Sequence, residues 1–268
     1  MTGKELKRQT MQGLQAIHTP GESSAITNLL FEWLGVGEDE NISLEKSEKH
    51  RIAVDRLLAH EPVQYVTGRA WFYEMPFRVT PEVLIPRPET EELVFHALKW
   101  LTSMHGRKVL DIGSGSGCIP ISMKKKMAGL DITSIDISAG ALEVARSNAA
   151  ALEADVHFIE MDFLSEENWK SLDQYDLIIS NPPYIALAER SMMEKNVTGY
   201  EPSLALFVPD NDPLLFYRKI AAFSKTHLKP NGKIFLELNQ NLAPETAALF
   251  PGSTVIKDVN GNNRILVG

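Results

Sequence analysis

The sequence contains a single cysteine, Cys118, among its 268 residues. One cysteine cannot form an intramolecular disulfide, which excludes a disulfide-stapled secreted domain and suits the reducing cytoplasm, the location we expect. The N-terminal segment is polar and charged and lacks the apolar core of a signal peptide. No apolar run approaches the ~20 residues that a membrane-spanning helix needs, so we expect no membrane partner.

Positive charge is also scarce, because 27 lysines and arginines stand against 35 acidic residues and leave a net charge of -8. Nonspecific nucleic-acid binding depends on cations that neutralise phosphates, so direct nucleic-acid binding is not expected. With one cysteine, scattered histidines and no His-Glu-x-x-His motif, the sequence predicts no metal site. The remaining composition is ordinary for a globular protein and allows one large domain with a small one beside it.

The chain divides into three segments by pattern. Residues 1–60 show helical periodicity and no strand, and predict a small N-terminal helical domain for substrate recognition. Residues 61–85 are aromatic and β-branched on both sides of a short polar break, and predict a β-hairpin linker. Strands and helices alternate over residues 86–268, which favours a doubly wound, Rossmann-like α/β sheet. Two final strands, joined at the turn residues 260–262, predict that the sheet ends in an antiparallel pair.

Within the first segment, the apolar spacing predicts three helices. Ser23 or Ser24 is the expected N-cap of the second helix, and Gly35 and Gly37 are expected to end it. The third helix is expected to stop before Pro62, since proline cannot continue a helix.

A glycine loop, residues 111–117, follows the first predicted strand of the sheet and precedes a helix. Its candidate ligand-binding residues are Asp111, Gly113, Ser114, Gly115, Ser116 and Gly117. The three glycines let the backbone turn tightly and approach a ligand closely. Because the usual dinucleotide spacing is absent, the ligand need not carry a pyrophosphate: N–H groups at the helix start can bind a carboxylate, and Asp111 can meet an ammonium group. The alternative is a tight turn without a ligand.

Acidic residues end the next two predicted strands. Asp136 can accept hydrogen bonds from two ribose hydroxyls. It can instead cap the following helix, a role that Ser138 could also fill. Asp162 can accept from an adenine amino group while Phe163 stacks on the ring, or both can belong to a strand-end turn with a core phenylalanine. Together these positions describe a ligand with an amino-acid end, a ribose and an adenine, which S-adenosylmethionine fits better than NAD.

The fourth strand ends in Asn181-Pro182-Pro183-Tyr184. Neither proline can donate to a sheet ladder, and Pro182 keeps Asn181 out of helical geometry, so the chain here is extended and stiff. The Asn181 side-chain oxygen and the Pro182 carbonyl can each accept one N–H of a planar nitrogen and orient its lone pair toward a methyl donor. We therefore predict Asn181 and Pro182 as catalytic, the four residues as substrate-binding with Tyr184 stacking on the planar group, and Asn181 as also near the donor. A proline-terminated strand in a surface loop is the alternative.

These motifs resemble those of amino-methyltransferases that modify planar nitrogens. Residues 62–94, together with Tyr-Glu-Pro-Ser-Leu-Ala-Leu-Phe-Val at 200–208 and the last twelve residues from Lys257, narrow the resemblance to the peptide-chain release factor N5-glutamine methyltransferases, from about residue 60 onward. The chain departs from that family at residues 208–212, where a glycine-rich stretch is common, and at Phe163, where tryptophan is common.

The resemblance implies a class I methyltransferase sheet and a reaction. It implies that a methyl group passes from S-adenosylmethionine to the glutamine amide of the Gly-Gly-Gln loop of bacterial class 1 release factors. It also implies that Gly113 to Gly117, Asp136 and Phe163 hold the donor and that Asn181 to Tyr184 hold the glutamine amide. The N-terminal helices and the hairpin would then grip the body of the release factor.

Two other functions remain open at this point. A nucleic-acid N-methyltransferase would apply the same chemistry to the exocyclic amine of a flipped adenine or guanine; the net acidity and the absence of a base-recognition domain argue against it. A noncatalytic adaptor that binds an adenosine ligand would keep the glycine loop, and the intact Asn181 argues against it.

Overall fold

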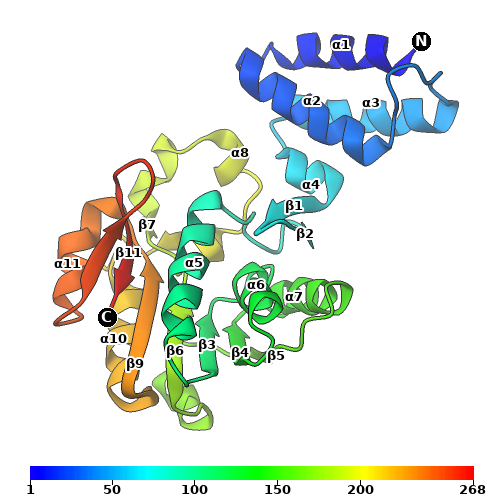
Figure 1. The fold of residues 1–268 in the computed structure, drawn as a ribbon. Helices are drawn as coiled ribbons and strands as arrows, with labels where there is room; N and C mark the ends of the chain where they lie inside the picture. The colour runs from blue at the N-terminus through cyan, green and yellow to red at the C-terminus, as the bar shows by residue number, and fades with distance from the viewer. The chain divides into compact units, whose positions relative to one another are not determined.

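The computed structural model describes residues 1–268 and divides them into two compact units (Figure 1). The smaller unit consists of Met1–Arg69 and Glu194–Tyr200, and the larger unit of Ala70–Met193 and Glu201–Gly268. The structure therefore places the first boundary after Arg69, rather than at the predicted positions 60 and 85. The recognition role predicted for residues 1–60 stays a prediction.

The smaller unit is helical. Its helices are α1 (Gly3–Leu14), α2 (Pro20–Leu34), α3 (Leu44–Leu58), α4 (Val63–Thr67) and α8 (Lys195–Thr198). Leu14, Leu30 and Leu57 are buried at its centre. The returning segment is tied to this unit by Tyr200, whose hydroxyl donates to the Ala59 carbonyl at 2.7 Å.

Helix α2 begins earlier than predicted. Thr19, not Ser23 or Ser24, is its N-cap, in a capping box with Glu22 that has Pro20 at the first helical position. Ser23 is buried within the helix. Gly35 ends the helix in the left-handed conformation, with a φ of 59°, as expected of a glycine at that position.

A β-hairpin follows α4. Its strands are β1 (Arg69–Phe72) and β2 (Met75–Arg78), joined by Tyr73 and Glu74, which both have positive φ. Phe72 and Phe77 are fully buried in the core of the larger unit. Residues 61–85 thus contain a short helix as well as the predicted hairpin.

The larger unit contains a seven-stranded sheet in the order β10-β11-β9-β6-β3-β4-β5. The pairs β9–β6, β6–β3, β3–β4 and β4–β5 are parallel, and β11 is antiparallel to both β9 and β10. The predicted doubly wound sheet with a terminal antiparallel pair is therefore confirmed. Its strands are β3 (Lys108–Ile112), β4 (Asp131–Asp136), β5 (His157–Glu160), β6 (Tyr175–Ser180), β9 (Leu228–Glu237), β10 (Thr254–Lys257) and β11 (Asn263–Val267).

Helices cover both faces of the sheet (Figure 1). One face packs against α5 (Pro88–Thr102), α6 (Cys118–Lys126) and α7 (Ala139–Ala151), and the other against α10 (Leu215–His227) and α11 (Ala243–Ala248). The strand residues alternate accordingly: Val109 faces the first layer and Leu110 the second. Because both faces are buried, apolar residues can follow one another along a central strand, as Leu177, Ile178 and Ile179 do in β6.

Short elements complete the larger unit. They are the 3₁₀ helices η1 (Glu166–Ser171), η2 (Leu187–Met192) and η3 (Gln240–Leu242), the helix α9 (Ser203–Leu206), and the strands β7 (Ile185–Ala186) and β8 (Phe207–Val208), which pair in parallel. No helix combines the length and the apolarity that crossing a bilayer demands.

The strand order reverses between β3 and β6. The chain proceeds from β3 to β4 and β5 on one side, and then crosses to β6 and β9 on the other. Doubly wound sheets bind ligands at the carboxyl ends of the strands at such a reversal. Ile112 and Ser180, the last residues of β3 and β6, are register partners, and the Ser180 hydroxyl donates to the Ile112 carbonyl at 2.6 Å. The glycine loop and the Asn-Pro-Pro-Tyr segment therefore begin side by side.

Candidate active site

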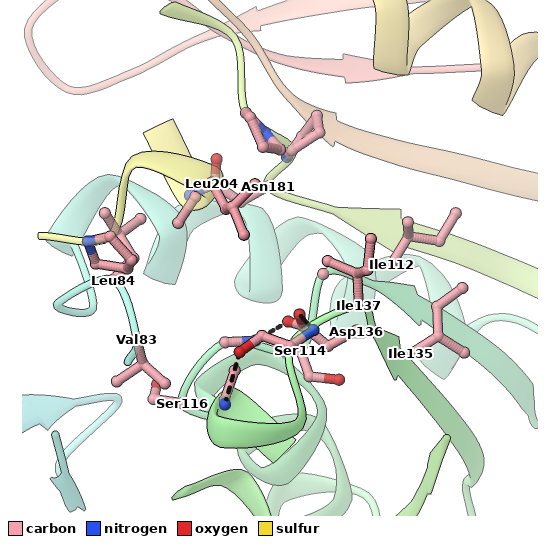
Figure 2. A pocket seen from close by; sticks show the side chains of 18 of the residues that line it. Val83, Leu84, Ile112, Ser114, Ser116, Ile135, Asp136, Ile137, Asn181 and Leu204 are labelled. Atoms are coloured by element: carbon pink, nitrogen blue, oxygen red, sulfur yellow. Dashed lines mark hydrogen bonds between the residues drawn. The ribbon is translucent and has the colours of Figure 1, made fainter. Parts of the chain in front are cut away.

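A cavity of about 280 Å³ opens at this edge of the sheet (Figure 2). Its walls include Gly113–Ser116 after β3, Asp136–Ser138 after β4, Met161–Leu164 after β5 and Asn181–Pro183 after β6. Asn181 and Leu204 lie across the cavity from Ser114, Ser116 and Asp136 (Figure 2). The volume is near the lower end of the range for small-molecule sites, roughly 300–1,000 Å³.

Most of the predicted site residues line this cavity. They are Gly113, Ser114, Gly115, Ser116, Asp136, Asp162, Phe163, Asn181, Pro182 and Pro183. Three predicted residues, Asp111, Gly117 and Tyr184, do not line it. The donor and acceptor segments predicted from separate motifs thus share one cavity, while the role of each residue stays a prediction.

The glycine loop depends on left-handed backbone conformations. Gly113, Gly115 and Gly117 have φ values of 88°, 51° and 80°. A Cβ at Gly113 or Gly115 would meet nothing within 4 Å, so these glycines leave space beside the backbone, whereas a Cβ at Gly117 would lie 2.8 Å from Ile121 Cδ1. Gly117 is also the N-cap of α6, and no side chain caps that helix. The N–H groups of Cys118 and Ile119 at the start of α6 are therefore not capped by a side chain and can face an anionic group, whereas Pro120 has no N–H.

Asp111 lies behind the loop and is fully buried. Its Oδ2 accepts from the Ser134 hydroxyl at 2.6 Å, Ser134 shares a second bond of 2.6 Å with the Ser114 hydroxyl, and Oδ1 has no partner. Burial raises the pKa of the Asp111 carboxyl to about 8, so it is mostly neutral at pH 7. This position braces the loop through Ser114. The contact of Asp111 with an ammonium group stays a prediction.

Asp136 organises the loop from the neighbouring strand. Its Oδ2 accepts from the Gly115 N–H and its Oδ1 from the Ser138 N–H, each at 2.9 Å. Ser138 itself caps α7 through the Ala141 N–H, so the helix does not use Asp136 as its cap. Burial raises the pKa of Asp136, and the backbone N–H groups act in the opposite direction. Each carboxylate oxygen keeps a lone pair for a further donor.

The third strand end contributes both a polar and an apolar wall. Asp162 Oδ1 accepts from the Leu164 N–H at 2.9 Å. Phe163 is buried, and its ring packs against Trp169 and Phe223 with ring centroids 5.5 and 5.4 Å apart. Phe163 is thus a core residue that also borders the cavity, which combines the two alternatives left open by the sequence. Stacking of its ring on an adenine stays a prediction.

Asn181 presents its side chain in a fixed orientation. Its Nδ2 donates to Thr90 Oγ1 at 3.1 Å, so its Oδ1 is the group left for a ligand. Pro182 is buried beside it. Tyr184 instead points its hydroxyl to Glu237 Oε1 at 3.4 Å, and burial raises the pKa of that hydroxyl. The predicted stacking of Tyr184 on the substrate stays a prediction.

Several residues near the site were missed by the sequence analysis. The Thr90 hydroxyl donates to Glu237 Oε2 at 2.6 Å, and both side chains are buried. The available signal was Glu237 itself, a charged residue inside the apolar run at 234–238, because an unpartnered carboxylate is costly in a core.

Glu201 is a second missed residue. Its carboxylate is buried, pairs with Arg87 at 2.5 Å and accepts from the Ile85 N–H at 3.2 Å. The bonds connect the start of the segment that contains α9 and Leu204 to the segment before α5, and both segments line the cavity. The sequence analysis gave Glu201 and Arg87 no role, because a single sequence carries no signal that pairs residues 114 positions apart.

Neither a reactive thiolate nor a metal-binding cluster is present at the cavity. Cys118 borders it, and burial raises the pKa of its thiol to about 12, so the thiolate nucleophile is scarce at neutral pH. No group of three or more histidine, cysteine or acidic side chains is arranged to hold a metal ion.

Comparisons with known proteins agree with this architecture. The family model for the methyltransferase small domain matches residues 92–198. A release factor glutamine methyltransferase of Bacteroides thetaiotaomicron is 42% identical over 268 residues, which cover 95% of this chain and 95% of that protein. The protein of the same name from Streptococcus pneumoniae is 41% identical and covers 98% of this chain and 94% of its own length.

The fold also resembles a solved structure. The Thermus thermophilus 16S rRNA N2 G1207 methyltransferase, in complex with AdoMet and guanosine, has a TM-score of 0.55 and is 18% identical, over 75% of this chain and 49% of that chain. At this identity the likeness concerns the fold alone. It agrees with the class I methyltransferase sheet expected from the sequence.

Proposed function

Since the chain belongs to the release factor glutamine methyltransferase family, and is thus an S-adenosylmethionine-dependent methyltransferase, we propose that its substrate is the Gly-Gly-Gln glutamine of class 1 release factors. The methyl group is transferred to the side-chain amide nitrogen (N5) of that residue. The proposal includes a cytoplasmic location, because the substrate belongs to the translation machinery, and it includes no direct contact with nucleic acid.

The residues of the cavity suit S-adenosylmethionine as the donor. The uncapped first turn of α6 offers N–H groups to its carboxylate, and the space beside Gly113 and Gly115 admits a group close to the backbone. The lone pairs of Asp136 can accept from ribose hydroxyls, and apolar side chains such as Ile137 and Phe163 offer an adenine site. When bound, the donor supplies a methyl carbon activated by an adjacent sulfonium.

The observation that carries the proposal is the hydrogen bonding of the Asn181 side chain. Its Nδ2 is already engaged by Thr90, which leaves Oδ1 as an acceptor in the same cavity as the glycine loop. Asn181 Oδ1 accepts one N–H of the glutamine amide and the Pro182 carbonyl accepts the other. Two acceptors orient the nitrogen lone pair toward the methyl carbon, and orientation of this kind can be worth roughly 7–11 kcal/mol.

The transfer needs no strong base. The amide nitrogen attacks the methyl carbon, the carbon–sulfur bond breaks, and the sulfur keeps the electron pair. The methylated nitrogen then carries one extra proton. That proton is acidic once the nitrogen–carbon bond has formed, and it passes to water. The two acceptors also stabilise the positive charge that develops on the N–H groups.

Mass spectrometry tests this function. A class 1 release factor is incubated with the protein and S-adenosylmethionine. Its Gly-Gly-Gln glutamine should gain roughly 14 mass units, the mass of one methylene, at a rate that depends on the orientation of the amide. A matched release factor with that glutamine replaced by alanine should gain nothing. Methylation of RNA or DNA in a parallel reaction, with the release factor unmodified, would assign the chain to another substrate.

Asn181→Ala provides the first prediction. It should lower turnover by about 10²–10³, because one aligned polar group is lost at the transition state. Donor affinity measured by calorimetry should stay unchanged, since the glycine loop and Asp136 are intact. Asn241→Ala, at an exposed position outside the cavity, is the matched control. Equal turnover of Asn181→Ala and wild type would refute the role of Asn181.

A further inference from the structure

Asn181 is connected to a buried carboxyl group through one hydroxyl. Asn181 Nδ2 donates to Thr90 Oγ1 at 3.1 Å, and Thr90 Oγ1 donates to Glu237 Oε2 at 2.6 Å. Thr90 and Glu237 are each 2% exposed. Thr90 borders the cavity and Glu237 does not. The three residues come from the end of β6, the first turn of α5 and the end of β9, so three elements of the larger unit converge here.

We propose that Thr90 and Glu237 are positioning residues that set the orientation of the Asn181 amide for methyl transfer. A hydroxyl has one proton, and the Glu237 carboxylate holds it. The Thr90 oxygen is then left to accept, and only the Nδ2 end of Asn181 can donate to it. The inference rests on the proposed function, because it presupposes that Asn181 Oδ1 accepts from the substrate amide.

The orientation matters because the two ends of an asparagine amide have opposite hydrogen-bonding properties. With Nδ2 toward Thr90, the acceptor Oδ1 faces the substrate N–H. After a half-turn of the amide, Nδ2 would face that N–H donor to donor, and the alignment of the nitrogen lone pair would be lost. If the Thr90 hydroxyl proton were free, it could donate to Oδ1 and stabilise this wrong orientation.

Glu237 is held rigidly at the other end of the chain of hydrogen bonds. Tyr184 Oη lies 3.4 Å from its Oε1, and the hydroxyl of Tyr217 donates to its backbone carbonyl at 3.0 Å. Arg264, on the adjacent strand β11, favours the carboxylate, but its guanidinium is bonded to Asp258 at 3.1 Å. The carboxylate therefore has no direct cationic partner, and its strongest hydrogen bond is to Thr90.

The protonation state of Glu237 determines the direction of the hydrogen bonds that link Glu237, Thr90 and Asn181. Burial raises the pKa of Glu237 to about 7 and nearby Glu89 acts in the same direction, whereas Thr90, Arg264 and Tyr184 oppose the shift. The neutral hydroxyl of Tyr217 and the neutral thiol of Cys118 also lie near this carboxyl group. Above about pH 7 the carboxylate accepts from Thr90. Below it, the protonated carboxyl can donate to Thr90 instead, so turnover should fall as the pH decreases through about 7.

Thr90→Val tests the inference, with the full-length protein, S-adenosylmethionine and a whole release factor. The valine keeps the shape of the side chain and removes the hydroxyl. Turnover should fall about 10–100-fold, as expected when a reacting group is misoriented. The acid limb near pH 7 should disappear, and donor affinity should not change. Thr90→Ser should restore turnover and the limb, and Thr102→Val, at the exposed end of the same helix, is the control for the substitution itself.

Glu237→Gln tests the chain of hydrogen bonds from its other end, whether or not Thr90→Val folds. Its amide can donate to or accept from Thr90, so turnover should fall and the acid limb should be lost. The decisive comparison is the double variant with Asn181→Ala, in which Thr90→Val should cause no further loss. An equal additional loss in that background, or wild-type turnover with an intact acid limb in Thr90→Val, would overturn the inference. Wild-type turnover in Asn181→Ala alone would instead refute the role of Asn181, and a Gly-Gly-Gln glutamine left unmethylated by the wild-type protein would overturn the proposed function.

Discussion

At the scale of single residues, Asp136 shows how one carboxylate can both build a loop and receive a ligand. It bonds to the N–H groups of Gly115 and Ser138 while retaining lone pairs toward the cavity. The proposed ribose contact therefore uses a carboxylate whose orientation is fixed before the donor arrives. Such preorganisation lowers the entropic cost of binding.

Asp136→Ala should mainly weaken donor binding. Loss of charge-assisted hydrogen bonds costs roughly 1.5–3 kcal/mol, so the dissociation constant should rise about 10–100-fold in calorimetry. Asp131→Ala, at the exposed start of the same strand, is the matched control and should bind the donor as wild type does. Unchanged affinity in Asp136→Ala would show that the ribose assignment is wrong.

The sequence predicted the residues that share a local motif and missed those that depend on tertiary contacts. Asn181 could be predicted because the two prolines that follow it indicate a stiff, extended segment at the end of a strand. Thr90 and Glu237 lie 91 and 147 residues from their partners, at distances where a single sequence contains no pairing information. Asp111 belongs to the motif, but the motif does not reveal that its side chain turns toward Ser134 instead of the cavity.

At the scale of elements, the connection from β3 to α6 is sensitive to substitution. Three left-handed glycines lie within five residues, and only Gly117 is also crowded, by Ile121 and Ala145. The loop is thus constrained both by backbone conformation and by packing.

Gly117→Ala should therefore lower the free energy of unfolding by about 1–3 kcal/mol, measured by urea titration, because a Cβ would strain the φ of 80° and clash with Ile121. Donor affinity should fall with it, since the first turn of α6 would shift. Gly129→Ala, where nothing lies within 4 Å of the new Cβ, is the control and should be close to neutral. Similar stability of the two variants would contradict the strain argument.

The elements themselves were largely predictable, for physical reasons. Apolar β-branched runs alternating with helical periodicity are typical of a sheet covered on both faces, so the strands β3 to β6 and their helices could be predicted from the pattern. The predicted start of α2 was wrong because Thr19, Ser23 and Ser24 are all good N-cap residues. Thr19 is the N-cap in the structure because it forms reciprocal hydrogen bonds with Glu22.

At the scale of the whole molecule, the smaller unit leaves several apolar side chains exposed. Trp33, Leu44, Ile52 and Leu58 are 42%, 92%, 48% and 40% exposed. A few residues usually dominate a protein interface, and large apolar side chains on the surface can be among them. These four are the positions at which the predicted grip on the release factor can be tested.

Alanine substitution at each of these four positions should show whether the smaller unit binds the whole release factor but not a short peptide. At least one variant should raise KM for the whole release factor several-fold, by roughly the 1–2 kcal/mol of an interface residue, and leave KM for a short Gly-Gly-Gln peptide unchanged. Phe95→Ala, an exposed aromatic position in the larger unit, is the control. If no variant changes the ratio of the two KM values, the smaller unit does not grip the substrate through these side chains.

The division into units could be foreseen only in part. The change from helical periodicity to a strand pattern predicts a boundary near residue 60, whereas the smaller unit extends to Arg69. The return of residues 194–200 to the smaller unit depends on contacts such as that of Tyr200 with Ala59, which have no local pattern.

Cys118 gives the molecule a built-in chemical label. It is the only thiol in the chain and it borders the cavity. Because no other thiol is present, a thiol-directed reagent has one position to modify, and the raised pKa of Cys118 makes that reaction slow. A molecule seated over the glycine loop would shield that sulfur, so the fraction of protein that carries a single adduct would report occupancy of the cavity without radioactivity and without turnover.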